Sequence, residues 1–251
     1  MMEERVIEVA GLRTTVVGDL TLARFVVVLL HGFAMEPEDL SPFAHSLAVP
    51  GLFLFPRGPL AGAIEPGLER GRAWWHIDPV PRTAALALGP RDFSGEHPVG
   101  LAEARATLGR FLDAVRGLGP DLGARPLVVG GFSQGAMLVC DAFLRAPRPL
   151  AGLVLLSASR IAFDEWPPFL ADWGRAAFPY PPVFASHGHA DQDLAFDAGC
   201  ALRDCLVDAG ADVTWVPFDQ GHEIPLVVWR RFRKFLLAIA GRRPSRPPPT
   251  P

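Results

Sequence analysis

Short apolar runs alternate with segments of helical spacing along most of the chain. The runs predict buried strands, which are expected at 24–30, 52–55, 127–129, 150–156, 183–186 and 212–217. Apolar residues that recur every three or four positions predict helices at about 37–47, 101–118, 137–144, 194–209 and 224–240. An antiparallel hairpin, 6–9 with 14–17, is expected to precede them. This alternation favours a mostly parallel sheet with helices on both faces.

Two segments interrupt the alternation, at about 58–99 and 161–182. A connection as long as the first is more often a functional loop than a spacer. Residues 1–240 are therefore predicted to form a single α/β domain with two loop inserts. The proline- and arginine-rich tail, 241–251, has no apolar surface to bury and is expected to be disordered.

The composition indicates one large core and argues against nucleic acid as a partner. A chain of 251 residues with 49% hydrophobic content supplies one large core, and a formal net charge of −3 gives no electrostatic footprint for nucleic acid. Three cysteines predict buried thiols in a reducing compartment rather than a disulfide scaffold.

The sequence also lacks the patterns of a membrane protein. The N-terminus reads M-M-E-E-R, acidic where a signal peptide is basic, and the longest apolar run, 25–30, is too short to cross a bilayer. The last helix is basic and amphipathic, with Val227, Val228 and Phe232 on its apolar side, which predicts packing on the sheet rather than on a membrane. We therefore expect a cytoplasmic protein without stable membrane insertion.

The strongest candidate for chemistry is a serine between the strand at 127–129 and the following helix. The segment G-F-S-Q-G places Ser133 between Gly131 and Gly135, which leave room for a sharp turn. Such a turn exposes the hydroxyl at the N-terminal end of a helix, where free N–H groups face developing negative charge. Ser133 is therefore a candidate nucleophile.

A candidate acid and base follow two later strands. Asp191 comes after the strand at 183–186, and His222 comes after the strand at 212–217. Loops at the carboxyl ends of parallel strands gather at one edge of a sheet, so these side chains are expected to meet Ser133 there. Their order along the chain is the order of serine, acid and histidine in α/β-hydrolases. Asp193 remains an alternative acid.

The chain resembles the phospholipase/carboxylesterase family, which includes the acyl-protein thioesterases. The resemblance extends from about Val26 to Ile239, and G-G-F-S-Q-G-A-M is its most specific part. It rests on L-H-G-F at 30–33, G-R-A-W-W at 71–75, G-G-F-S-Q-G-A-M at 130–137, L-S-A-S at 156–159, H-G-x-x-D at 187–191 and G-H-E-I at 221–224. It implies the α/β-hydrolase fold, with a mostly parallel central sheet and helices on both faces.

The resemblance also implies roles for individual residues. Ser133, Asp191 and His222 correspond to the catalytic triad, and the backbone N–H groups of Phe33 and Gln134 correspond to the oxyanion hole. Ala34 departs from the family, in which glycine is frequent at this position, and is expected to be tolerated if its φ is negative. The residues after Asp191 also depart, because the usual apolar, proline-containing stretch is replaced by Gln192, Asp193 and Leu194.

Aromatic residues of the two inserts point to an apolar acyl or aryl group in the substrate. The candidates for the pocket wall are Trp74, Trp75, Phe93 and Trp166, although a pair of tryptophans also suits a buried anchor for a long loop. The predicted function is a serine carboxylesterase that hydrolyses small to medium acyl or aryl esters. Alternatives are a thioesterase or lysophospholipase on the same triad, carbon–carbon bond cleavage or perhydrolysis, and a non-catalytic ligand-binding module.

No cofactor is required by this chemistry. The segment H-G-H-A-D, 187–191, is similar to the H-x-H-x-D of binuclear metal hydrolases, but glutamine occupies the next position, where a further histidine is expected. We therefore predict no metal site, with His187 packed or hydrogen-bonded near the loop and His189 solvated. A small-molecule ester is the expected partner, and an aromatic rim around the site would also suit a homodimer.

Overall fold

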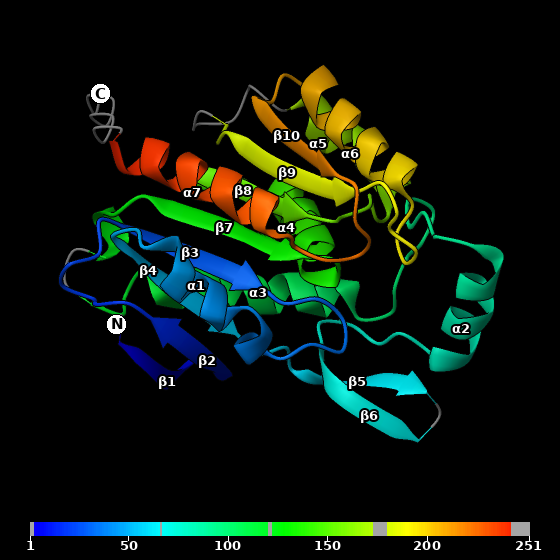
Figure 1. Ribbon diagram of the computed structural model, residues 1–251, viewed down its shortest axis with the longest axis horizontal. Coiled ribbons are helices and arrows are strands. Elements are labelled where there is room, and N and C mark those ends of the chain that lie inside the picture. Colours follow the sequence, from blue (N-terminus) through cyan, green and yellow to red (C-terminus); the bar gives the residue numbers. More distant parts are fainter. Residues whose placement is uncertain (1–2, 66, 120–121, 173–179, 242–251) are drawn as a thin grey trace.

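An eight-stranded sheet forms the centre of the computed structural model, which describes residues 3–65, 67–119, 122–172 and 180–241 (Figure 1). Its strands, in spatial order, are β1 (Glu4–Val9), β2 (Leu12–Val17), β4 (Gly51–Pro56), β3 (Phe25–Leu30), β7 (Leu127–Phe132), β8 (Gly152–Leu156), β9 (Val183–Gly188) and β10 (Val213–Phe218). From β4 to β10 all neighbours pair in parallel, whereas β1 and β2 form the predicted antiparallel hairpin. The predicted mostly parallel sheet is confirmed.

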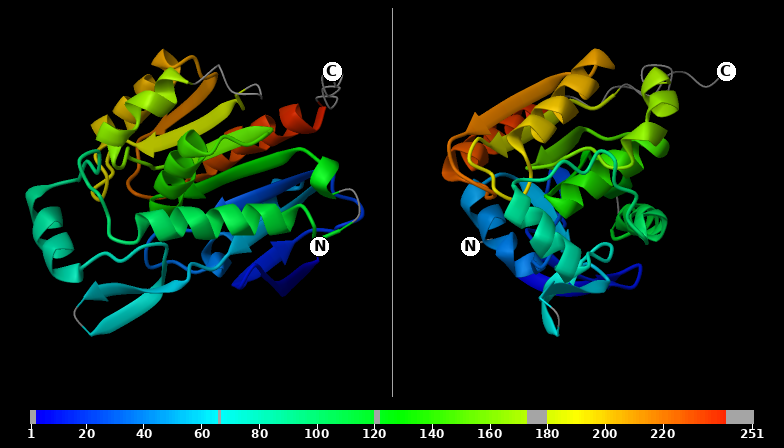
Figure 2. Two further views of the ribbon diagram at one scale, coloured as in Figure 1. Left: turned by 180° about the vertical axis from the view of Figure 1, so that it is seen from behind. Right: turned by 90° about the vertical axis from the view of Figure 1, so that its right-hand side faces the viewer.

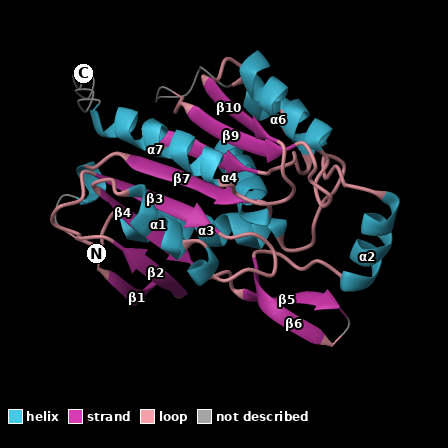
Figure 3. Ribbon diagram, in the orientation of Figure 1, coloured by secondary structure: helices cyan, strands magenta, loops and turns pink. Residues whose placement is uncertain are grey.

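Helices cover both faces of this sheet, as Figures 2 and 3 show. On one face lie α1 (Ser41–Leu47) and α7 (Leu226–Gly241); on the other lie α3 (Leu101–Val115), α4 (Gln134–Arg145) and α6 (Phe196–Asp208). The continuous apolar runs follow from this layering. In β3, Val26 and Val28 pack toward α3 and α4, whereas Phe25 and Val27 pack toward α1 and α7.

The segment predicted as an irregular insert at 58–99 contains regular structure. Strands β5 (Leu60–Glu65) and β6 (Leu68–Ala73) form a separate hairpin, and α2 (Pro79–Leu88) follows it. Asp78 caps α2 by accepting the N–H of Val80 at 2.9 Å, and Pro79 occupies the first helical position. These elements were not predicted because Pro79 and Pro81 at the start of α2 are typical of a loop and because the hairpin register shifts twice.

The second insert and the C-terminal region are described in part. A short helix, α5 (Pro167–Ala171), follows a 3₁₀ turn at Phe163–Glu165, while residues 173–179 and the tail from 242 onward lie outside the described residues. Helix α7 packs on the sheet as predicted. Its buried side includes Trp229, whereas Val227, which was predicted to lie on that side, is exposed. Among the described residues, no helix combines the length and apolarity needed to span a membrane.

Candidate active site

Ser133 lies on a strained turn between β7 and α4. Its φ of +53° and ψ of −119° fall outside the regions that L-residues normally occupy. The surrounding structure holds this conformation, because the Ser133 N–H donates to the carbonyl of Leu156 at 2.8 Å and its own carbonyl accepts the N–H of Met137 at 3.0 Å. Ser133 directly follows β7, so the turn lies at the carboxyl edge of the sheet, where the arrowheads of β3, β7 and β9 end in Figure 1.

The two glycines beside Ser133 are required by close backbone contacts. A Cβ at Gly131 would lie 2.5 Å from the carbonyl carbon of Gly135, and a Cβ at Gly135 would lie 2.6 Å from the carbonyl oxygen of His31. Neither distance leaves room for a methyl group. The close approach of β7, the turn and the end of β3 therefore explains why both positions are glycine.

Three side chains that are far apart in the sequence meet at this turn. Nε2 of His222 lies 2.9 Å from Oγ of Ser133, and Nδ1 of His222 lies 2.7 Å from Oδ2 of Asp191. The ring of Phe132 packs against the imidazole with a centroid distance of 4.8 Å. Sequence reasoning missed this contact, since nothing in the spacing of Phe132 marks it. The arrangement can pass a proton from an alcohol to an imidazole whose far nitrogen is held by a carboxylate.

Asp191 is buried but accepts several hydrogen bonds. Oδ1 accepts the backbone N–H groups of Asp193 and Leu194, each at 2.9 Å, and Oδ2 faces Nε2 of His187 at 3.3 Å in addition to His222. Burial alone would raise the pKa of Asp191, but the hydrogen bonds from His187 and His222 hold that pKa well below its usual range. Asp191 is therefore a carboxylate at neutral pH.

The position of Asp193 differs from that of a triad acid. Its carboxylate pairs with Arg82 of α2 at 3.2 Å and with Arg91, and its carbonyl oxygen accepts the N–H of Arg91 at 3.0 Å. The Arg82 guanidinium in turn lies 5.4 Å from the centroid of the Phe33 ring. Asp193 thus ties the first insert to the loop that carries Asp191, and it is Asp191 that contacts His222.

Two backbone N–H groups near Ser133 remain free to donate. Among the described residues, neither Phe33 nor Gln134 has a hydrogen-bond acceptor for its backbone N–H. Gln134 begins α4, so its N–H is one of those that a helix leaves unpaired at its N-terminus. Phe33 belongs to the loop after β3, which approaches the Ser133 turn closely enough that a Cβ at Gly32 would lie 3.2 Å from Cβ of Ser133.

The β5–β6 hairpin fixes the loop that carries Phe33. The N–H of Ala34 donates to the carbonyl of Arg72 at 2.8 Å, and the N–H of Arg72 donates to the carbonyl of Met35 at 2.9 Å. Gly71, with a φ of +61°, lies directly against this loop, since a Cβ there would be 2.2 Å from the carbonyl oxygen of Ala34. The motif G-R-A-W-W therefore serves to hold the neighbouring loop in place.

Ala34 has a φ of +59°, so the condition of a negative φ is not met. The left-handed conformation costs an L-residue about 1–2 kcal/mol, which explains the preference for glycine at this position. We expect Ala34→Gly to raise the free energy of unfolding by about 0.5–1 kcal/mol in urea denaturation, because the strain relieved exceeds the chain entropy lost. The comparison variant is Ala48→Gly, which makes the same substitution at another alanine with positive φ. A lower stability of Ala34→Gly would contradict this expectation.

His31 is a buried, neutral residue beneath the same loop. Its Nδ1 donates to the carbonyl of Gly32 at 2.7 Å, and its Nε2 accepts the N–H of Gly58 at 2.9 Å. Burial lowers the pKa of His31 from 6.5 to about 4. Protonation at Nε2 would remove the acceptor for Gly58, so the neutral form is part of the folded structure.

The stability of the protein is expected to fall at acid pH because of His31. Its pKa is lower in the folded state than in the unfolded state, so its contribution is complete above pH 6.5 and is lost as the pH falls toward 4. Between pH 7 and pH 5 this loss amounts to about 2 kcal/mol. Urea midpoints of the wild type and His31→Gln at both pH values measure it. Equal pH dependence of the two proteins would contradict the assignment.

The side chain of Gln134 has a structural role that sequence reasoning did not identify. Its Oε1 accepts the backbone N–H of Trp74 at 2.9 Å, and its Nε2 donates to the carbonyl of Trp75 at 3.0 Å. The indole of Trp74 donates to the carbonyl of His31 at 2.9 Å. The first insert is therefore anchored to the start of α4 by a buried amide.

The structure corrects part of the predicted pocket wall. Trp74, Trp75 and Trp166 are all buried, but Trp74 and Trp166 line neither of the two cavities described next, and the indole of Trp166 donates to Asp141 at 2.9 Å. Trp75 and Phe93, although also mostly buried, line a cavity of about 430 Å³ beneath α2. Another hollow, of about 820 Å³, is lined by His222 together with Gln192, Asp193 and Leu86 among others.

The histidines of H-G-H-A-D serve different purposes. His187 is buried against Asp191, whereas His189 is half-exposed and pairs with Asp219 at 3.4 Å. In the part of the chain that the structure describes, no group of three or more His, Cys, Asp or Glu side chains is placed to hold a metal ion.

The profile of the phospholipase/carboxylesterase family matches residues 14–239. Over 100 residues the chain is 31% identical to acyl-protein thioesterase 1 of Neurospora crassa, a match that covers 38% of this chain and 39% of that protein. The chain thus spans well under half the length of this relative.

Solved structures show the same architecture. Esterase PE8 superposes with a TM-score of 0.67 at 24% identity, covering 95% of this chain and 99% of that one. Acyl-protein thioesterase 2 of Zea mays gives a TM-score of 0.68 at 21% identity, covering 91% and 99%. The protein has the α/β-hydrolase fold, as predicted. It belongs to the phospholipase/carboxylesterase family of hydrolases.

Proposed function

We propose that the protein is a serine carboxylesterase that hydrolyses small to medium acyl or aryl esters through an acyl-enzyme intermediate. The observation that carries this proposal is the unbroken chain of short contacts from Asp191 through His222 to Ser133 Oγ, beside two backbone N–H groups that have no acceptor in the part of the chain that the structure describes. A ligand-binding module has no need of a nucleophile, a base and an acid in contact.

In the proposed reaction Oγ of Ser133 attacks the ester carbonyl while Nε2 of His222 takes its proton. Asp191 keeps the proton of the imidazole on Nδ1 before the attack and stabilises the charged ring after it. The N–H groups of Phe33 and Gln134 stabilise the oxyanion. His222 then protonates the leaving alcohol, and a water activated by the same imidazole releases the acid and restores Ser133.

The test is covalent labelling with a fluorophosphonate probe. We expect the folded wild type to be labelled and Ser133→Ala to remain unlabelled. Ser157→Ala is the matched control, since this buried serine follows Leu156, whose carbonyl accepts the Ser133 N–H, and its own hydroxyl has no hydrogen-bond partner among the described residues. Absence of labelling on the folded wild type, or labelling of Ser133→Ala, would overturn the proposal.

An acyl thioesterase is the second candidate, favoured by the similarity to acyl-protein thioesterase 1 of Neurospora crassa. The same three side chains serve both reactions, and the difference lies in the leaving group, which departs on the His222 side. Aryl esters of increasing acyl length, assayed beside the corresponding thioesters, separate the two candidates. A kcat/KM that is higher for every thioester than for its ester would favour the second candidate.

A further inference from the structure

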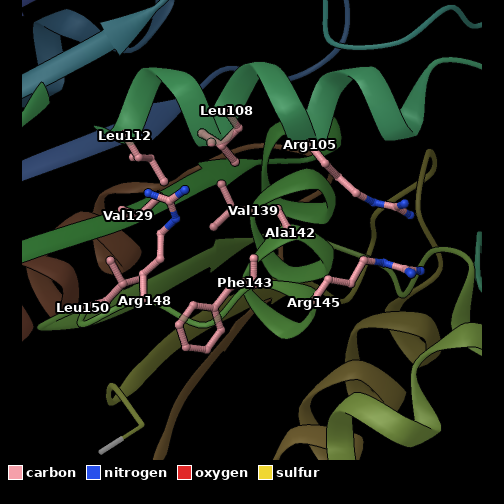
Figure 4. Close-up of a pocket in the computed structure, with 12 residues that line it drawn as sticks. Arg105, Leu108, Leu112, Val129, Val139, Ala142, Phe143, Arg145, Arg148 and Leu150 are labelled. Atoms are coloured by element: carbon pink, nitrogen blue, oxygen red, sulfur yellow. The ribbon is translucent and has the colours of Figure 1, made fainter. Parts of the chain in front are cut away.

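A small cavity between α3 and α4 plays no part in the proposed reaction. Its volume is about 100 Å³, and none of its lining residues belongs to the Ser133 site. Figure 4 shows these side chains converging from α3, β7, α4 and the segment before β8. We propose that the cavity binds a short-chain aliphatic carboxylate, with its chain among apolar side chains and its carboxylate on the guanidinium of Arg148.

The interior of the cavity suits a short hydrocarbon chain. Its apolar walls are Leu108, Leu112, Val129, Val139, Phe143 and Leu150. An apolar cavity of about 150 Å³ stays dry and takes up benzene, so about 100 Å³ matches an aliphatic chain of about four carbons. Longer acyl groups would extend beyond these walls.

A glycine in the middle of α3, Gly109, lines the cavity beside Arg148. Glycine weakens a helix interior relative to alanine, so Gly109 is unexpected in a helix of this length unless the space is used. A Cβ at this position would lie 3.4 Å from Nη2 of Arg148. Any longer side chain there would occupy the space beside the guanidinium.

The charged residues that line the cavity favour an anion. Three of the lining residues are arginines and none is a carboxylate. Arg105 and Arg145 both pair with the buried Asp141, and their guanidinium groups point away from the apolar walls in Figure 4. Arg148 instead extends toward Leu112.

Arg148 is the arginine that remains available to a ligand. Its ion-pair partner is Asp113 of α3, whose side chain is 68% exposed. A pair of this kind contributes little to stability, because water and salt compete for both charges. A ligand carboxylate whose chain is buried beside the guanidinium can therefore share or replace Asp113, whereas the matching alcohol gains only the apolar contacts.

The test is a titration of the full chain, carrying ¹³C-labelled leucine and valine methyl groups, with sodium butanoate. We expect saturable NMR shifts at Leu108, Leu112 and Val139. Arg148→Met, which keeps the apolar stem, and butan-1-ol in place of the acid should each weaken binding by about tenfold. Arg110→Met, which removes an arginine of α3 that does not line the cavity, should bind as the wild type does.

A variant that fills the cavity gives a second test of butanoate binding. Ala142→Leu is expected to abolish the shifts without removing the cation, since Ala142 lines the cavity from α4. No saturable shift at Leu108, Leu112 and Val139 up to about 50 mM butanoate would overturn the proposal. Equal affinity of acid and alcohol, or of the wild type and Arg148→Met, would overturn it as well, because the cavity would then select for apolarity alone.

Discussion

Replacing Asp191 by asparagine is expected to lower kcat by about 10⁴-fold while leaving the fold intact. The reason lies in the fixed orientation of this side chain. Oδ1 accepts two backbone N–H groups, from Asp193 and Leu194, so the amide oxygen of an asparagine must take this position. The amide nitrogen then faces Nδ1 of His222.

That orientation imposes the wrong tautomer on the base. An NH₂ group at the Oδ2 position can only donate, so Nδ1 of His222 must accept and the ring proton must reside on Nε2. Nε2 then donates to Oγ of Ser133 instead of taking its proton. Initial rates with an activated aryl ester measure the effect, and the melting temperature shows that the variant is folded.

Asp193→Asn is the matched control, because it changes the neighbouring carboxylate in the same way. It removes the ion pairs to Arg82 and Arg91, so we expect a loss of about 1–2 kcal/mol in stability and less than a tenfold change in kcat. A 10⁴-fold loss in Asp193→Asn together with a mild effect in Asp191→Asn would transfer the role of the acid to Asp193.

The central sheet could be predicted because its strands are buried on both faces. A continuous apolar run such as 25–30 is typical of a strand covered by helices on either side, and the helices between the runs carry clear apolar faces. The β5–β6 hairpin and α2 could not be predicted in this way. The two register shifts of the hairpin interrupt the alternation typical of a strand, and Pro79 and Pro81 at the start of α2 are typical of a loop.

The candidate site could also be predicted only in part. Ser133, Asp191 and His222 each follow a predicted strand, so topology alone brings them to one edge of the sheet. The pocket wall depended instead on which way each ring points. Trp74 and Trp166 point inward because their indole N–H groups find buried acceptors in His31 and Asp141. Spacing along the chain carries no information about such hydrogen bonds.

The β5–β6 hairpin makes the loop that carries Phe33, whose N–H belongs to the proposed oxyanion hole, sensitive to a residue outside the site. Gly71→Ala would place a methyl group 2.2 Å from the carbonyl oxygen of Ala34 and 2.8 Å from its neighbour, the nitrogen of Met35. Because β6 is paired on the other side with β5, we expect the loop to move and carry the N–H of Phe33 away from the oxyanion. Loss of one such donor costs about 10²–10³ in kcat.

Gly67→Ala separates this effect from backbone strain. Gly67 turns the same hairpin with a φ of +78°, but a Cβ there would have no atom of the described, non-adjacent residues within 4 Å. Both variants incur the left-handed strain of about 1–2 kcal/mol, visible as a lower melting temperature. Only Gly71→Ala also displaces the loop after β3, so only this variant should show a lower kcat and slower fluorophosphonate labelling. Equal kcat in the two variants would mean that the Phe33 N–H is held by the loop itself, independently of the hairpin.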